Sequence, residues 1–377
     1  MLSCAVFAMK VPFIDLTRQI KSLRPQIDRV FDTQLKKPEF ILGPAVTRFE
    51  REFANFCRKK FCVGLNSGTD ALTLALKAYG IGTGDEVITV ANSFFSTAMA
   101  ISNTGATVVF VDCDPNYYTM DTSQLQDKIT KKTRAIIPVH LYGQTADMDP
   151  ILALANKYRL AVIEDACQAH GAKYKNRIVP VGETGAFSFY PTKNLGAFGD
   201  GGCVVTDNYH LYKRITYLRN NGSLKKYIHT MFGINSRLDS LQAAILTLKL
   251  QHLSLENGKR RILASVYTTL LSSIKQITPP NQHEHCHHVY HLYVVECTYR
   301  DKLQEYLRSH GINTLIHYPT PLHLQKPYRE LGYKHGNFPI SEEKSKRILS
   351  LPMFPYMSEI EVRYVCQTIA TFYRRFH

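Results

Sequence analysis

The chain has 377 residues, 45% of them hydrophobic and 20% charged, which is enough for one large or two ordinary domains with a sizeable core. No apolar run approaches the length of a membrane span, and the apolar start of the chain lacks the basic region of a signal peptide. The net charge of +15 lies on dispersed Lys and Arg residues without a nucleic-acid-binding motif, so we expect an anionic small substrate and neither a membrane nor a nucleic-acid partner.

Apolar, β-branched segments alternate with helical patterns through the first half of the chain. We expect strands at 60–66, 86–90, 107–112, 134–143 and 161–166, and helices at 70–80, 96–105 and 147–159. Such alternation is typical of an α/β fold whose mostly parallel sheet is covered on both faces. Ligands of these sheets bind beyond the carboxyl ends of the strands.

The pattern changes near residue 250. A helical pattern over 238–274 is expected to break near Asn257-Gly258, and a strand at 288–297 and a helix at 301–311 follow it. We therefore predict a large domain at 1–250 and a smaller α+β C-terminal domain at 251–377. About the first 25 residues are expected to pack on the smaller domain.

The nine cysteines are scattered, odd in number and without a CxxC pair. This usage indicates reduced thiols rather than a disulfide framework. We therefore expect a cytoplasmic protein.

The stretch "NSGTDALTLAL" places Gly68 and Thr69 between an expected strand and an expected helix. The first N–H groups of a helix are unpaired, and its dipole favours an anion at that end. The alternative is an ordinary helix cap.

Two ionisable residues follow apolar strands. Asp165 ends the strand of "AVIEDACQAHGA", and Lys193 follows the aromatic strand at 185–190. Apolar surroundings disfavour the charge of a lysine and make its amine nucleophilic, whereas Asp165 alone can equally cap a helix. An amine, a carboxylate and an anion cradle on one sheet edge are what pyridoxal 5′-phosphate (PLP) requires.

The chain resembles the DegT–DnrJ sugar-nucleotide aminotransferases, which have the PLP fold type I of aspartate aminotransferase. The resemblance runs from "VPFIDL" to "LPMFP" and is carried by "NSGTDALTLAL", "HLYGQTADMDPI", "IEDACQAHGA", "SFYPTKNLGAFGDGG" and "GINSRLDSLQAAIL". It implies a mostly parallel seven-stranded sheet between helices in the large domain.

The resemblance implies a role for each matching residue. Lys193 would form the Schiff base with the cofactor, and Asp165 would face its pyridinium nitrogen. Gln168 would meet the ring hydroxyl, and Phe94 of "NSFFST" would stack on the ring, although the proline that commonly opens this motif is missing. The remaining cofactor contacts would be phosphate ligands, namely Gly68, Thr69, Ser188 and, from the neighbouring subunit of a homodimer, Asn235.

Polar residues near these motifs are candidates for substrate contact, although each can equally be a structural residue. They are Tyr190, Asn194, Arg237, His317, Tyr318 and His323.

The resemblance implies transfer of an amino group from L-glutamate to a nucleotide-linked keto-sugar, for lipopolysaccharide, O-antigen or a related glycan. The family's dehydratases carry histidine in place of the lysine, so Lys193 favours transamination. "NSRLD" followed by "HYPTPLH" resembles enzymes that aminate C3 of a dTDP-3-keto-6-deoxyhexose, whereas the C4 branch tends to carry "NYRM". The alternatives are amination at C4, amination of a UDP-linked 3-keto uronic acid, and a non-enzymatic regulator with this fold.

His283, His285 and His287 would share one face of a strand, where a metal could bind. The segment follows a Pro-Pro break and lacks a carboxylate-rich surrounding. We therefore expect no metal site.

Overall fold

A computed structural model describes residues 9–375. The apolar start of the chain at 1–8, from which we inferred the lack of a signal peptide, lies outside the described residues, as do 376–377. Within the described part, none of the helices combines the length and the apolar character needed to cross a membrane.

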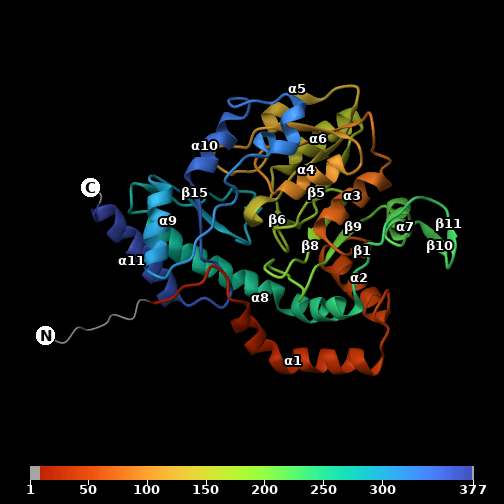
Figure 1. The fold of residues 1–377 in the computed structure, drawn as a ribbon, viewed down its shortest axis with the longest axis horizontal. Helices are drawn as coiled ribbons and strands as arrows, with labels where there is room; N and C mark the ends of the chain where they lie inside the picture. Colours follow the sequence, from red (N-terminus) through yellow and green to blue (C-terminus); the bar gives the residue numbers. More distant parts are fainter. Residues whose placement is uncertain (1–8, 376–377) are drawn as a thin grey trace.

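The centre of the fold is a seven-stranded sheet in the order β1-β9-β8-β5-β4-β2-β3 (Figure 1). The antiparallel strand is β9, which runs between β1 and β8, and the other neighbouring pairs are parallel. This confirms the predicted α/β fold with its mostly parallel seven-stranded sheet. The strands are β1 (Phe61–Leu65), β2 (Glu86–Val90), β3 (Thr107–Val111), β4 (Thr133–Ile137), β5 (Ala161–Asp165), β8 (Thr184–Ser188) and β9 (Gly202–Thr206).

Helices cover both faces of this sheet, as buried strands on both sides require. On one face α3, α4 and α7 pack against side chains such as Val63 and Ile163. Their strand neighbours Cys62 and Val162 point to the other face, where α2, α8 and α6 lie. The helices are α2 (Pro44–Phe56), α3 (Gly68–Ala78), α4 (Phe95–Ser102), α5 (Leu125–Lys128), α6 (Met148–Tyr158), α7 (Tyr209–Leu218) and α8 (Ser240–Leu271).

A second core forms around a three-stranded antiparallel sheet in the order β12-β14-β15. The N-terminal segment joins it, because Val11 pairs with Ile312 and is fully buried there. Arg18 of α1 also binds the Glu361 carboxylate at 2.7 and 2.8 Å. The elements are α1 (Leu16–Lys36), β12 (Ile277–Thr278), β14 (Tyr293–Cys297), α9 (Arg300–Ser309), α10 (Pro339–Arg347), β15 (Ile348–Leu351) and α11 (Glu359–Arg375).

Short strands complete the structure. β6 (Lys173–Tyr174) pairs with β7 (Arg177–Ile178) and with β13 (Cys286–His287). β10 (Ser223–Lys225) and β11 (Ile228–His229) form a hairpin that projects from the large sheet beside α7 (Figure 1). The strand expected at 288–297 begins at Tyr293, because the residues before it form a buried loop.

The predicted break near Asn257-Gly258 is wrong, because α8 runs unbroken for 32 residues. The Asn257 side chain is buried and bonds Asn194 and the backbone carbonyl of His170, both at 2.8 Å. These contacts offset the low helix propensity of the Asn-Gly pair. Figure 1 shows α8 running from the large sheet toward α9 and α11, so the expected domain boundary at 250 lies inside one helix.

Candidate active site

A cavity of about 510 Å³ opens at the carboxyl edge of the large sheet. This volume suits a small-molecule site, and its position is the one expected for a parallel sheet. Most of the residues predicted from the sequence line it, namely Gly68, Thr69, Phe94, Asp165, Gln168, Ser188, Tyr190, Lys193, His317 and Tyr318.

One wall of the cavity is the start of α3. Ser67 caps the helix by accepting a hydrogen bond from the Asp70 amide at 3.1 Å, so Gly68 and Thr69 form the first turn. Their amide N–H groups belong to the set that a helix leaves unpaired. Ser188 lies opposite, where β8 ends. An anion is the ligand that such an arrangement favours.

Gly68 leaves no room for a side chain. An added Cβ would lie 2.7 Å from Ser188 Cβ and 2.8 Å from Cys167 Sγ. We expect Gly68→Ala to push α3 away from β8 and weaken binding of the cofactor phosphate, at a cost of about 1–3 kcal/mol. Titration of the apoprotein with PLP, followed by absorbance, measures the loss.

Gly258→Ala is the matched control, because an added Cβ there meets no atom within 4 Å. It should stabilise α8 by about 0.5–1 kcal/mol and leave PLP binding unchanged. Equal PLP affinity in the Gly68→Ala and native proteins would contradict the role of Gly68.

Lys193 reaches the cavity from the turn after β8. Among residues 9–375, no hydrogen bond or ion pair holds its ammonium, although its backbone N–H donates to Tyr190 at 2.9 Å. Burial lowers the pKa of the Lys193 amine below its ordinary value, while Cys167 and Asp165 oppose this shift. A buried amine that spends more time uncharged is a better nucleophile.

Asp165 ends β5 and is 6% exposed. Its Oδ2 accepts a hydrogen bond from Thr97 at 2.8 Å, and its Oδ1 accepts one from the Cys167 amide at 3.2 Å. The preceding residue, Glu164, points to the other face of the sheet, where it binds His140 at 2.8 Å. The Asp165 carboxylate therefore lies at the cavity, whereas the Glu164 carboxylate lies in the core on the other face of the sheet.

Gln168 and Tyr318 form a hydrogen-bonded pair on the cavity wall. Gln168 Oε1 accepts from the Tyr142 amide at 2.9 Å, and its Nε2 donates to the Tyr318 hydroxyl at 3.1 Å. Nε2 keeps a second hydrogen for a ligand. Phe94 is 51% exposed and lines the cavity, with its ring centroid 5.6 Å from that of Tyr318.

His317 and His291 complete the wall on the side of the second core. Burial, together with the charge of Lys193, lowers the pKa of His317 to about 4 and that of His291 well below its usual value. His291 Nδ1 lies 3.1 Å from the Asn194 Oδ1 oxygen, which can only accept, so Nδ1 carries the proton. The lone pair of His291 is therefore on Nε2.

Asn194 itself does not line the cavity. Its amide is buried, and Nδ2 donates to Asn257 at 2.8 Å and to the carbonyl of Val289 at 3.2 Å. The substrate contact expected of Asn194 has no support in this geometry. Its side chain instead ties the Lys193 turn to α8.

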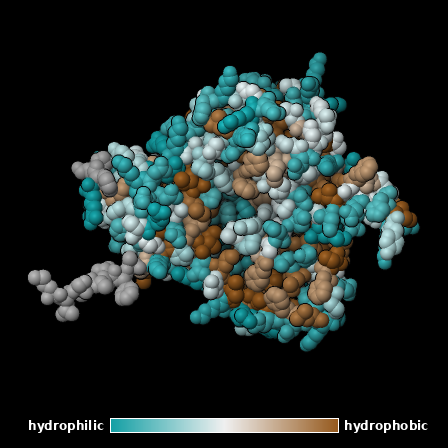
Figure 2. Space-filling model, viewed as in Figure 1, coloured by the Kyte–Doolittle hydropathy of each residue, from teal (hydrophilic) through white to brown (hydrophobic). Residues whose placement is uncertain are grey.

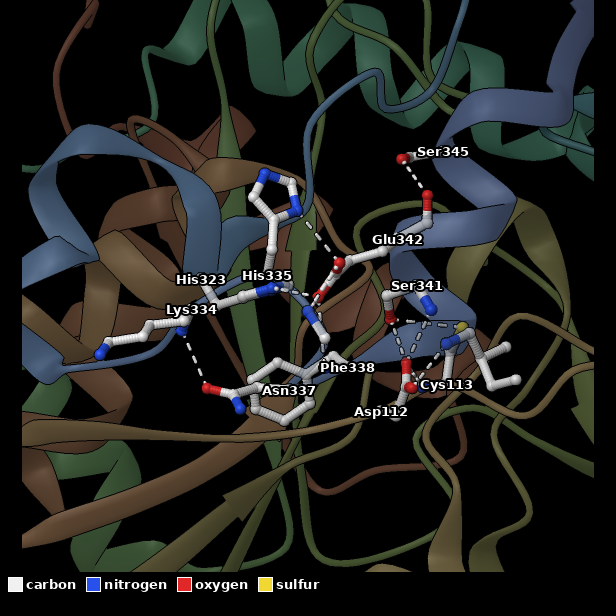
Figure 3. Close-up of polar contacts among 12 residues, drawn as sticks. Asp112, Cys113, His323, Lys334, His335, Asn337, Phe338, Ser341, Glu342 and Ser345 are labelled. Atoms are coloured by element: carbon white, nitrogen blue, oxygen red, sulfur yellow. Dashed lines mark hydrogen bonds and ion pairs between the residues drawn. The ribbon is translucent and has the colours of Figure 1, made fainter.

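His323 is also directed elsewhere. It is fully buried in the 3₁₀ turn Leu322–Leu324, and its Nε2 lies 3.0 Å from the Glu342 carboxylate. Figure 3 shows His323 and His335 both pointing at Glu342, which also accepts from the Gly336 amide at 2.9 and 3.0 Å. These hydrogen bonds hold the segment before α10 in place. His323 is therefore engaged by Glu342, and the geometry does not support its expected contact with a substrate.

Asn235 and Arg237 lie in a separate hollow. Asp200 lines both this hollow and the cavity, so the two adjoin. Asn235 is exposed at the base of the β10-β11 hairpin. Ser236 is buried, bonds Asn66 and does not line the cavity.

In the described part of the chain, no group of three or more His, Cys, Asp or Glu residues is arranged so that it could hold a metal ion, and this includes the histidine-rich segment. His283 packs on Tyr117 with ring centroids 4.9 Å apart. His285 packs on Tyr174 at 6.1 Å.

Sequence reasoning missed several residues that line the cavity, among them Thr97, Cys167 and His291. Thr97 and Cys167 lie inside the quoted motifs, but nothing in their spacing indicates that they bond Asp165. His291 lies at the end of the histidine-rich segment, and nothing in that segment indicates that it lines a cavity.

The residues present fit PLP. One cavity is surrounded by an amine that has no partner among residues 9–375, a carboxylate at β5 and a helix start too tight for a Cβ. These features, on this sheet, define a PLP-dependent enzyme of fold type I. The chain belongs to the DegT/DnrJ/EryC1/StrS aminotransferase family, whose profile matches residues 21–370. Aminotransferases of this family use PLP.

Known relatives cover nearly the whole chain. A "dTDP-3-amino-3,6-dideoxy-alpha-D-galactopyranose transaminase" of Aneurinibacillus thermoaerophilus is 46% identical over 95% of this chain and 98% of its own. A "Pleiotropic regulatory protein" of Geobacillus stearothermophilus is 46% identical over 98% of this chain and 100% of its own. The crystal structure of S. venezuelae DesV in complex with a ketimine intermediate superposes with a TM-score of 0.95 at 42% identity, covering 96% and 98% of the two chains.

Proposed function

We propose that this aminotransferase moves the amino group of L-glutamate to C3 of a 3-keto-6-deoxyhexose linked to a nucleoside diphosphate, most simply dTDP. The observation that carries the chemistry is the amine of Lys193, which has no partner in the described part of the chain and shares one cavity with Asp165 and the start of α3. The similarity to a transaminase named for a dTDP-3-amino sugar supports the substrate. The net charge of +15 favours the anionic diphosphate.

PLP, when bound, supplies an electron sink that stabilises negative charge at the carbon next to the nitrogen. The residues of the chain bind the cofactor and move the protons. Gly68, Thr69 and Ser188 would hold the phosphate, and Asp165 would hold the proton on the ring nitrogen. The amine of Lys193 would take the proton from the glutamate carbon and later return one to the sugar carbon.

The balance of the reaction fixes its products. Glutamate gives up its amino group and leaves as 2-oxoglutarate. One water supplies the keto oxygen of 2-oxoglutarate, and the keto-sugar then accepts the amino group while its own carbonyl oxygen leaves as water. The cofactor ends as it began, so neither an oxidant nor a reductant is needed.

The regiochemistry is tested with matched 3-keto and 4-keto dTDP-sugars, each incubated with glutamate. We expect NMR of the products to place nitrogen at C3. A site built to hydrogen-bond a sugar hydroxyl rejects a misplaced one by up to about 10⁴-fold. Nitrogen at C4, with the 3-keto sugar ignored, would overturn the substrate assignment and favour the C4 alternative. A UDP-linked 3-keto uronic acid is the third substrate to include.

A second candidate function is favoured by one finding, the similarity to a protein named as a pleiotropic regulator. A regulator that kept the fold without turnover would not convert glutamate. The half-reaction of the PLP form with glutamate separates the two, because it is followed by absorbance without any sugar. The free amine of Lys193 favours the enzyme.

We also propose a homodimer in which Asn235 completes the phosphate site of the partner. Large apolar side chains are exposed on the hairpin beside it, including Tyr227 at 84% and Phe232 at 103%. Surfaces of this kind mark protein interfaces. In Figure 2 this projection is mostly hydrophilic in colour, with a few hydrophobic residues at its surface.

Mixing two inactive variants tests the shared site. If Lys193→Ala chains are combined with Asn235→Ala chains, a mixed dimer has one site with both changes and one with neither. Activity should therefore return on mixing. Absence of recovery, after mass spectrometry has verified subunit exchange, would contradict a shared site.

We place the enzyme in the cytoplasm. The cysteines within residues 9–375 are all free thiols, as a reducing compartment maintains them. Nucleotide sugars and glutamate are charged metabolites that this compartment supplies. Use of the product in lipopolysaccharide, O-antigen or a related glycan is consistent with this location.

A further inference from the structure

Two buried hydroxyl groups on the cavity wall form a hydrogen-bonded chain that ends on Asp165. Thr97 Oγ1 is 2.8 Å from Asp165 Oδ2, and Ser93 Oγ is 2.8 Å from Thr97 Oγ1. Thr97 is 1% exposed and Ser93 is 3% exposed. Both come from the loop and first turn at the start of α4, whereas Asp165 ends β5.

The direction of the chain follows from the chemistry of its ends. A carboxylate only accepts hydrogen bonds, so Thr97 donates its single hydroxyl hydrogen to Asp165. Its oxygen is then free to accept, and Ser93 must be the donor of the second bond. The chain runs from Ser93 through Thr97 to Asp165. Hydrogen bonds in such a chain polarise and strengthen one another.

Both oxygens of the Asp165 carboxylate accept hydrogen bonds. Thr97 holds Oδ2, and the Cys167 amide holds Oδ1 at 3.2 Å. A carboxylate has about four lone-pair sites, so further sites remain for a ligand in the cavity. Thr97 also belongs to the first turn of α4, whose dipole favours negative charge at that end.

We propose that Thr97, with Ser93 bonded to it, is a positioning residue that holds the Asp165 carboxylate toward the ring nitrogen of the cofactor. The inference rests on the PLP-dependent activity but not on the identity of the sugar. Thr97 acts through Asp165, so its loss should change the protonation of the ring nitrogen as well as the rate.

The test compares Thr97→Val, which keeps the shape and removes the hydroxyl, with Thr97→Ser, which keeps the hydroxyl. The first readout is the ¹⁵N NMR shift of PLP labelled at the ring nitrogen, which reports its protonation without turnover. The second is the single-turnover rate with glutamate. We expect the valine variant to shift the ring signal toward the unprotonated form and to react about 10- to 100-fold more slowly. The serine variant should stay within about 3-fold of the native rate.

Ser93→Ala provides a test that leaves Thr97 in place. We expect a smaller shift of the same sign, and no further effect when it is added to Thr97→Val, because Ser93 acts through Thr97. Additive losses in the double variant would overturn the order of the chain.

An unchanged ring signal in folded, PLP-bound Thr97→Val would overturn the proposal, as would equal losses in the serine and valine variants. If Thr97→Val fails to fold, the ring signal of Ser93→Ala decides in its place. A protein that shows these effects but ignores every keto-sugar would disprove the substrate assignment and leave this inference intact.

Discussion

Lys193→Ala is expected to abolish turnover, with a loss of about 10³- to 10⁴-fold or more. The amine of Lys193 is the group in the cavity that can both attach the cofactor and move the proton at the substrate carbon. Steady-state transamination measures the loss. Borohydride treatment of the native PLP form, followed by peptide mapping, should show the reduced cofactor on Lys193.

Lys249 supplies the matched control, because burial also lowers the pKa of its amine, to about 8. Its Nζ donates to the Gly196 carbonyl at 2.5 Å and lies 5.5 Å from the centroid of the Phe198 ring, outside the cavity. We expect Lys249→Ala to cost stability and to keep covalent PLP. A borohydride label on Lys249, or on any lysine other than Lys193, would contradict the assignment.

The parts of the site that follow strands could be predicted from the sequence. An alternating pattern of strands and helices determines which chain ends meet at the carboxyl edge of the sheet, so Lys193, Asp165 and the start of α3 were expected together. Their grouping in one cavity agrees with that expectation. These three groups already pointed to PLP, and the resemblance to the family added the roles of the other site residues.

The contacts between distant side chains could not be predicted in this way. Thr97 bonds Asp165 across 68 residues of sequence, and His291 bonds Asn194 across 97. Local patterns say which face of an element a residue lies on, but not which polar group packs against it. The break expected at Gly258 was wrong for the same reason, since buried contacts of Asn257 override propensity.

Asp165→Asn is expected to retain PLP and to lose most of the activity, by about 3 kcal/mol of transition-state stabilisation. The phosphate cradle and Lys193 remain in place, so the cofactor still binds. A neutral amide cannot hold the proton on the ring nitrogen, and without that proton the ring is a weaker electron sink. The single-turnover rate with glutamate measures the loss, and absorbance of the purified protein reports bound PLP.

Glu164→Gln separates this effect from a general loss of a buried charge. Glu164 is fully buried next to Asp165 in β5, but it faces His140 and the amides of Val181 and Gly182, away from the cavity. Its replacement should lower the free energy of unfolding by about 1–3 kcal/mol and leave the rate per folded site nearly unchanged. If Asp165→Asn instead unfolds the protein and keeps the native rate in the folded fraction, the carboxylate is structural and the role assigned to it at the ring nitrogen is wrong.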